Sequence, residues 1–157
     1  LMAKLKIGFI PIEGGHYYKE ALEEVVRAED LGFHSVWMEE HHSVVNHYWP
    51  SPLPVLAGFA TRTSKMVLGT DILVAPFYHP TRLAEDCALL DIMSNGRFVL
   101  GIAIGYKPDE FALYGAELER RGAIFSSVSS PMSPGNSARS PIHSRIKTTD
   151  RSFREPI

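Results

Sequence analysis

The sequence predicts a parallel α/β fold, and three observations lead to this prediction. Short apolar runs typical of buried strands alternate with segments whose apolar residues recur at helical spacing. Four such strand–helix units fit into the first 125 residues, about 31 residues each, which is the size of a βαβ crossover. The strands are continuously apolar rather than alternating, as in a parallel sheet that helices cover.

The first two units each pair a short strand with an amphipathic helix. Residues 6–11 form an apolar run that ends at a proline, so we expect a buried strand. Apolar residues then repeat at helical spacing over 18–26, and Gly32 stands where a helix C-cap is expected. Residues 35–38 predict the second strand, and residues 55–63 the second helix.

The third and fourth units follow the same order. Residues 66–75 predict one strand that carries a glycine and a polar pair. Pro80 suits the first turn of a helix that ends before the turn residues 94–96. Residues 98–104 predict the fourth strand, and a fourth helix begins within 109–113.

Two architectures satisfy this pattern, an open doubly wound sheet and a (β/α)8, or TIM, barrel. The first strand–helix turn, residues 11–16 (PIEGGH), has no G-x-G-x-x-G pattern and no phosphate-binding lysine. The glycines at 101 and 105 lie within and at the end of a strand, so they do not form that motif either. We therefore predict a barrel, of which four units make about half.

Composition and charge exclude several classes of protein. The chain has 157 residues and a formal net charge of −2, which gives no reason to expect a nucleic acid or an anionic membrane as partner. No apolar run approaches the ~18 residues of a membrane span, and we expect no signal peptide. The single cysteine, Cys87, forbids an internal disulfide and suits a reducing compartment, so we expect a cytoplasmic protein.

The last part of the chain differs in composition from the rest. Residues 126–157 hold nine serines, four prolines, five basic and two acidic residues, whereas residues 1–125 have an acidic excess. We predict a boundary near residue 125, followed by an irregular tail that is disordered or foreign to the barrel. We also expect that residues 126–131 (SSVSSP) do not form a helix.

Reactive groups of parallel α/β proteins lie at the carboxyl ends of strands, where the loops converge. Here those ends carry histidine, tyrosine and carboxylate side chains, at residues 39–42, 75–79 and 105–107. Neighbouring strand residues point to opposite faces, so His41 and His42 are poorly placed to bind one metal ion, and we predict no metal site. A structural role for both, in which one histidine caps the loop and the other is packed, remains an alternative to our preferred interpretation, a histidine that faces a ligand and serves acid–base chemistry. Asp71 lies in an apolar strand, so it is either hydrogen-bonded there or placed at a bulge near solvent.

Four segments together resemble the bacterial luciferase-like monooxygenases. They are residues 36–42 (VWMEEHH), 67–70 (VLGT), 79–86 (HPTRLAED) and 90–101 (LDIMSNGRFVLG). Their order and spacing match over about residues 4–125. The resemblance implies the N-terminal half of a (β/α)8 barrel that binds reduced FMN or the deazaflavin F420 in its mouth. Members that use FMN oxidise a small organic substrate with O2.

The resemblance also assigns site residues by position. Glu40 and His41 match an acid and a histidine near flavin and substrate, and we name them as catalytic candidates. Asp71 and Ile72 match a place where a non-proline cis peptide often lies under the flavin ring. Ala103 replaces a reactive cysteine of the luciferases, and Glu110 replaces an aspartate near the flavin. We expect these four residues to line the cofactor site, and light emission is not expected.

The resemblance thus predicts a flavin-dependent monooxygenase, present here as a truncated chain. Its cofactor would be reduced FMN supplied by a flavin reductase, and its substrates O2 and a small molecule. One alternative is an F420-dependent oxidoreductase of the same superfamily. Another is a non-catalytic half-barrel that associates through its open sheet edges. A homodimer is expected in either case.

Overall fold

The computed structural model describes residues 5–42, 48–129 and 148–149, and strands and helices alternate along them. The strands are β1 (Gly8–Phe9), β2 (Ser35–Met38), β3 (Val67–Thr70), β4 (Leu73–Val74), β5 (Phe98–Ala103) and β6 (Thr148–Thr149). The α-helices are α1 (Tyr18–Asp30), α2 (Pro52–Arg62), α3 (Pro80–Met93), α4 (Pro108–Tyr114) and α5 (Arg121–Ser129). Short 3-10 helices are η1 (Gly15–Tyr17), η2 (Ala75–Phe77) and η3 (Leu118–Arg120). No helix in this described part of the chain combines the length and apolarity needed to cross a membrane.

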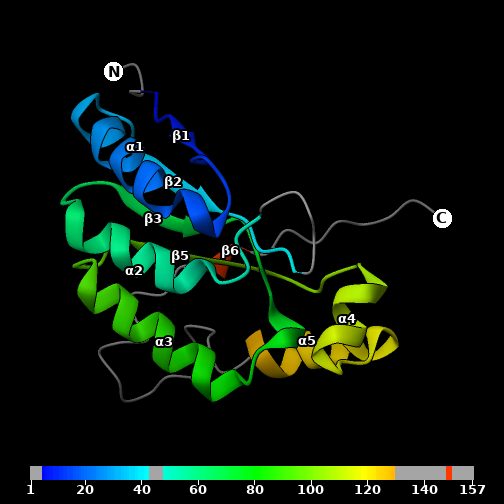
Figure 1. Ribbon diagram of the computed structural model, residues 1–157. Helices are drawn as coiled ribbons and strands as arrows, with labels where there is room; N and C mark the ends of the chain where they lie inside the picture. Colours follow the sequence, from blue (N-terminus) through cyan, green and yellow to red (C-terminus); the bar gives the residue numbers. More distant parts are fainter. Residues whose placement is uncertain (1–4, 43–47, 130–147, 150–157) are drawn as a thin grey trace, which may run out of the picture.

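The sheet is parallel, with strand order β1-β2-β3-β5-β4 and β6 paired with β5. Figure 1 shows α1, α2 and α3 side by side over one face, while α4 and α5 lie at the far end of the strands. The helices α1, α2 and α3 each return the chain to the start of the next parallel strand, which is the βαβ pattern. The parallel α/β prediction is therefore confirmed.

The core lies between the sheet and the three covering helices. Apolar side chains from both layers are fully buried there, and the larger ones are Val25, Val36, Met38, Leu56, Phe59, Leu68, Leu83 and Leu100. Each contributes about 1.5–3 kcal/mol relative to exposure. Cys87 is a buried core residue of α3, and burial raises the pKa of its thiol to about 12.

The predicted single strand over 66–75 is wrong in one respect, because the structure divides it into β3 and β4. Gly69 pairs with Val99, whereas Leu73 pairs with Ile102, so one extra residue lies between the two pairs. This is a β-bulge, and Asp71 is exposed at it, as one of the two interpretations of that residue expected. The Asp71–Ile72 peptide is cis, which confirms the expectation from the resemblance.

Beside the bulge, hydrogen bonds to a threonine side chain take the place of backbone hydrogen bonds between the strands. The Thr70 hydroxyl donates to the Gly101 carbonyl at 2.8 Å and accepts from the Gly101 N–H at 2.8 Å. A Cβ at position 101 would lie 2.2 Å from the Thr70 carbonyl oxygen, so only glycine allows this approach.

Helix α5 corrects the expectation that no helix forms after residue 125. It continues to Ser129 because Val128 packs into the core, and tertiary packing outweighs the low helix propensity of serine. The hydroxyls of Ser126 and Ser127 donate to the carbonyls of Gly122 at 3.0 Å and Ile124 at 2.7 Å. Val128 is fully buried on the core side. Most of the predicted tail, residues 130–147 and 150–157, lies outside the described residues, so the domain boundary stays a prediction.

Candidate functional site

A cluster of titratable side chains lies at the carboxyl ends of the strands, beside α4. Glu40, His41 and His42 lie in the segment after β2, which ends at Met38. Tyr78 follows η2, and Lys107 is the N-cap residue of α4, which carries Glu110 and Tyr114. Figure 1 shows α4 beyond the end of the sheet toward which β5 runs. We call these seven residues the strand-end cluster.

Glu40 is buried within this cluster, with 3% of its surface exposed. Its Oε2 accepts the Val74 N–H at 2.6 Å, and its Oε1 accepts the Tyr78 hydroxyl. Burial and the Glu40 charge raise the pKa of Tyr78 well above its ordinary value, so this hydroxyl stays a donor. Val74 pairs in register with Ala103, so the buried carboxylate adjoins the predicted cofactor position on β5.

His42 is also buried, and its two ring nitrogens differ in their partners. The Tyr114 hydroxyl lies 2.9 Å from Nδ1. Burial and the charges of Glu40 and Glu110 raise the pKa of Tyr114, so its hydroxyl stays protonated and can donate to Nδ1. The Nε2 atom lies 3.3 Å from Glu40 Oε1 without hydrogen-bond geometry. This is a buried polar atom whose hydrogen-bonding capacity is unused.

Two charged side chains meet at the imidazole of His41. Its Nδ1 lies 3.2 Å from Glu110 Oε1 and 3.2 Å from Lys107 Nζ. Lys107 Nζ is 3.7 Å from the same Glu110 oxygen, which also accepts the His42 backbone N–H at 3.0 Å. Glu110 therefore ties α4 to the segment that follows β2.

Aromatic contacts fix the position of α4. The Phe77 ring stacks on Tyr114 with centroids 4.5 Å apart and lies edge-on to Phe111 at 5.0 Å. Such pairs contribute about 0.5–1.5 kcal/mol beyond the area that they bury. The chain enters α4 through Gly105, whose φ of +73° and close approach to Val74 require glycine.

The structure brings three of the six predicted site residues, Glu40, His41 and Glu110, into the strand-end cluster. Ala103 adjoins it through Val74. Asp71 and Ile72 lie at the bulge, where the Asp71 N–H donates to the Met38 carbonyl at 2.8 Å. The site assignment missed four residues: His42, Tyr78, Lys107 and Tyr114. Tyr114 follows Glu110 by one helical turn, a spacing that could have pointed to it.

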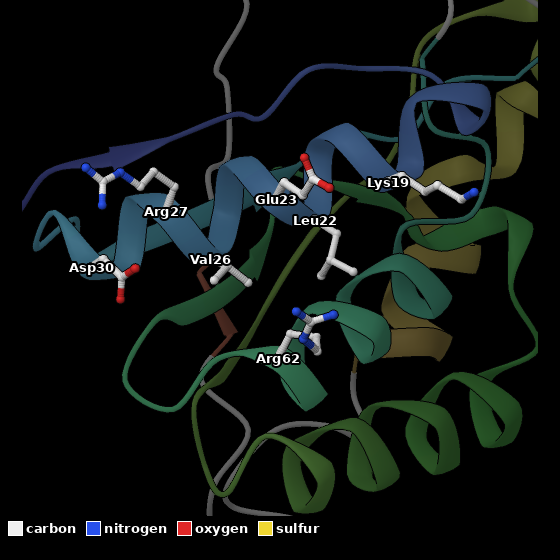
Figure 2. Close-up of a pocket in the computed structure, with 7 residues that line it drawn as sticks. All are labelled: Lys19, Leu22, Glu23, Val26, Arg27, Asp30 and Arg62. Atoms are coloured by element: carbon white, nitrogen blue, oxygen red, sulfur yellow. The ribbon is translucent and has the colours of Figure 1, made fainter.

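A surface groove lies elsewhere on the molecule. Figure 2 shows it between α1 and the end of α2, lined by Lys19, Leu22, Glu23, Val26, Arg27, Asp30 and Arg62. Its residues belong to the covering helices, and it contains no member of the strand-end cluster.

Comparisons with known proteins show the family of the chain. Residues 7–126 match the family model for luciferase-like monooxygenases. The oxygenase component of the flavin-dependent trigonelline monooxygenase of Acinetobacter baylyi is 42% identical over 56% of this chain and 24% of its own length. The F420-dependent glucose-6-phosphate dehydrogenase of Amycolatopsis mediterranei is 32% identical over 72% of this chain and 35% of its own length.

A solved structure gives the same result for the fold. The crystal structure of the monooxygenase RslO1 from Streptomyces bottropensis superposes with a TM-score of 0.70 and 31% identity, over 80% of this chain and 41% of that one. The chain thus spans about a third or less of the two curated relatives named above. The structural neighbours are TIM barrels, so the half-barrel prediction is confirmed. With its family match covering most of its length, this chain belongs to the luciferase-like monooxygenase family.

Proposed function

We propose that this chain forms part of a flavin-dependent monooxygenase that oxidises a small organic molecule with reduced FMN and O2. The observation that carries the proposal is the strand-end cluster, because it gathers two buried acids, the buried His42, a second histidine and two tyrosines at the end of the sheet where barrel enzymes bind ligands. Family membership and the flavin-dependent relative support the choice of cofactor.

The residues present suit the ring of a reduced flavin. His41 offers a ring nitrogen to the oxygen and nitrogen atoms of the flavin ring, and His42 Nε2 is a buried polar atom with unused hydrogen-bonding capacity. When bound, reduced FMN supplies two electrons, and with O2 these add one oxygen atom to the substrate and reduce the other to water.

Each part of the cluster has a separate task in this proposal. Glu40, fixed by Val74 and Tyr78, holds a negative charge beside His42. His41, held by Glu110 and Lys107, binds or moves a proton at its ring nitrogen. The aromatic contacts of Phe77 keep α4 over the site, where it limits the access of water.

A second candidate is an F420-dependent oxidoreductase, which transfers a hydride without O2. The F420-dependent relative from Amycolatopsis mediterranei favours it, at 32% identity over 72% of this chain. Titrating the purified chain separately with FMN and F420, while following the fluorescence of each, distinguishes the two. Tighter binding of FMN supports the first candidate, and tighter binding of F420 the second.

A matched pair of variants assigns any binding to the cluster. Glu110→Gln should weaken binding by about tenfold, since it removes a charge that positions His41. Lys19→Met, on the outer face of α1, should bind as the unmodified chain does. Binding of neither cofactor at high micromolar concentration would overturn the proposal that this chain holds an active site.

A third candidate is a non-catalytic half-barrel that pairs through its open edge, and it also accounts for the expected homodimer. The residues around β1 favour it, because Leu5 and Ile7 are 82% and 51% exposed. Sedimentation over a range of concentrations tests for the pairing, with Ile7→Lys as the variant that should abolish it. The flavin reductase partner and the cytoplasmic location belong to the first proposal and are tested with the full-length enzyme in its host cell.

A further inference from the structure

One nitrogen of His41 faces two groups of opposite charge. The Glu110 carboxylate and the Lys107 ammonium each lie 3.2 Å from Nδ1. Both approach the same atom, because Lys107 and Glu110 are three residues apart at the start of α4 and 3.7 Å from each other.

Nδ1 can serve only one of these neighbours at a time. If it carries a proton, it donates to Glu110, and its N–H then faces the ammonium group. If it carries none, it accepts from Lys107, and its lone pair then faces the carboxylate. In a neutral imidazole the choice at Nδ1 also decides Nε2, because a proton present at one nitrogen is absent from the other.

Both neighbours have further stabilising contacts, so either state of Nδ1 is sustainable. Glu110 Oε1 accepts the His42 N–H at 3.0 Å whether or not His41 donates to it. Lys107 is half-buried and keeps its ion pair with Glu110 in both states. The Tyr48 ring lies edge-on to His41, with centroids 4.6 Å apart and planes at 68°, and this contact holds the imidazole plane.

We propose that Lys107 is a positioning residue that competes with Glu110 for His41 Nδ1 and so selects the tautomer of His41. Through this competition Lys107 decides whether His41 Nε2 meets a ligand as a hydrogen-bond donor or as an acceptor. A donor suits a flavin carbonyl or an anionic oxygen, whereas an acceptor suits a substrate hydroxyl or another group that must lose a proton. The use of this choice in catalysis rests on the proposed function, but the competition itself is a property of the free protein.

The tautomer can be measured without flavin. The full chain, labelled with ¹⁵N, is examined at about pH 8–9, where imidazole is neutral, by two-bond ¹H–¹⁵N correlations of the histidine rings. His41→Gln identifies the His41 signals by their loss. Lys107→Met should raise the ratio of the Nδ1–H to the Nε2–H form by about tenfold, the effect of losing one charge-assisted hydrogen bond.

Two further variants make the test specific. Glu110→Gln should move the ratio in the opposite direction, because it removes the acceptor charge that favours a proton on Nδ1. Lys107→Arg keeps the positive charge and should keep the ratio of the unmodified chain, as should the distant Lys19→Met.

The proposal is overturned if Lys107→Met leaves the ratio unchanged, or if Lys107→Met and Glu110→Gln move it in the same direction. A structural role for Lys107 would change stability without this opposed pair of shifts. Because the measurement needs no cofactor, a failed FMN titration would contradict the proposed function and leave this result standing.

Discussion

The two ends of the sheet use charged side chains in different ways. At the amino end, the side chains of Arg97 and Glu29 form hydrogen bonds that hold the loop between α2 and β3 and the turn before β5 in place. The Arg97 guanidinium donates to five acceptors: Ala60 O, Thr63 O, Thr63 Oγ1, Met66 O and Ser94 O. The Glu29 carboxylate accepts the backbone N–H groups of Ser64, Lys65 and Met66 and the Ser64 hydroxyl. Each charge is met by several complementary groups.

At the carboxyl end the contacts are in competition. His41 Nδ1 lies between the Glu110 carboxylate and the Lys107 ammonium group, and His42 Nε2 is buried without hydrogen-bond geometry to Glu40. In barrel proteins the amino end commonly serves stability and the carboxyl end carries the chemistry. The difference here follows that division, because groups committed to backbone partners stabilise a loop, whereas groups with unused capacity can bind a ligand.

The largest expected effect belongs to Arg97. Arg97→Ala should lower the free energy of unfolding by about 3 kcal/mol or more, because it leaves carbonyls of two chain segments without their charged donor. Urea denaturation measures this, and the fully buried Cys87 thiol reports the same opening by its rate of reaction with a disulfide reagent.

Arg97→Lys is the matched control. It keeps the charge but loses the fork that reaches several carbonyls at once, so it should fall between the alanine variant and the unmodified chain. If Arg97→Ala lowers stability and also shifts the ratio of the His41 tautomers, the two ends of the sheet are coupled. The division between a stabilising end and a ligand-binding end would then be wrong.

Most of the fold could be predicted because its signals are local. The strand at 35–38 and the helix from Pro80 to the turn at 94–96 have the expected bounds, set by apolar period, proline and glycine. The bulge at Asp71 could not be found from periodicity, since apolar residues continue on both sides of it. The last turn of α5 was missed because serine-rich sequence is typical of an irregular segment, whereas this turn is stabilised by the burial of Val128, a tertiary contact.

The site was predicted only in part for a different reason. Residue types at the strand ends indicate where a site lies, but not which side chains meet. Tyr78 bonds to Glu40 across 38 positions, and Tyr114 reaches His42 across 72. These contacts depend on how η2 and α4 pack at the end of the sheet. That packing cannot be predicted from a local sequence pattern.

A smaller effect is expected at the carboxyl end, where Tyr78 donates to the buried Glu40. Tyr78→Phe should lower the free energy of unfolding by about 1–3 kcal/mol, because a buried carboxylate loses one of its donors. The control is Tyr106→Phe. Tyr106 is 71% exposed in the loop between β5 and α4, so this change should alter stability by less than about 0.5 kcal/mol. Equal stability of the two variants in urea would contradict the role given to Tyr78.

The smallest effect, and the one with a defined pH window, belongs to Glu29. Burial raises the pKa of its carboxyl, but the N–H groups of Lys65, Ser64 and Met66 lower it by more, so the folded-state pKa lies below its ordinary value of 4.5. A lowered acid pKa means that the unfolded chain binds more protons, so the stabilisation is complete above about pH 4.5 and is lost as pH falls through the folded-state pKa. Glu29→Gln should therefore cost about 1 kcal/mol at neutral pH, a modest figure because the carboxylate is partly exposed and screened. In urea denaturation the difference from the unmodified chain should shrink as the pH falls below 4.5 and through the folded-state pKa. If the difference stays constant down to acid pH, Glu29 stabilises the fold through the shape of its side chain and not through its charge. Of these two charged side chains, only Arg97 would then stabilise the amino end through its charge.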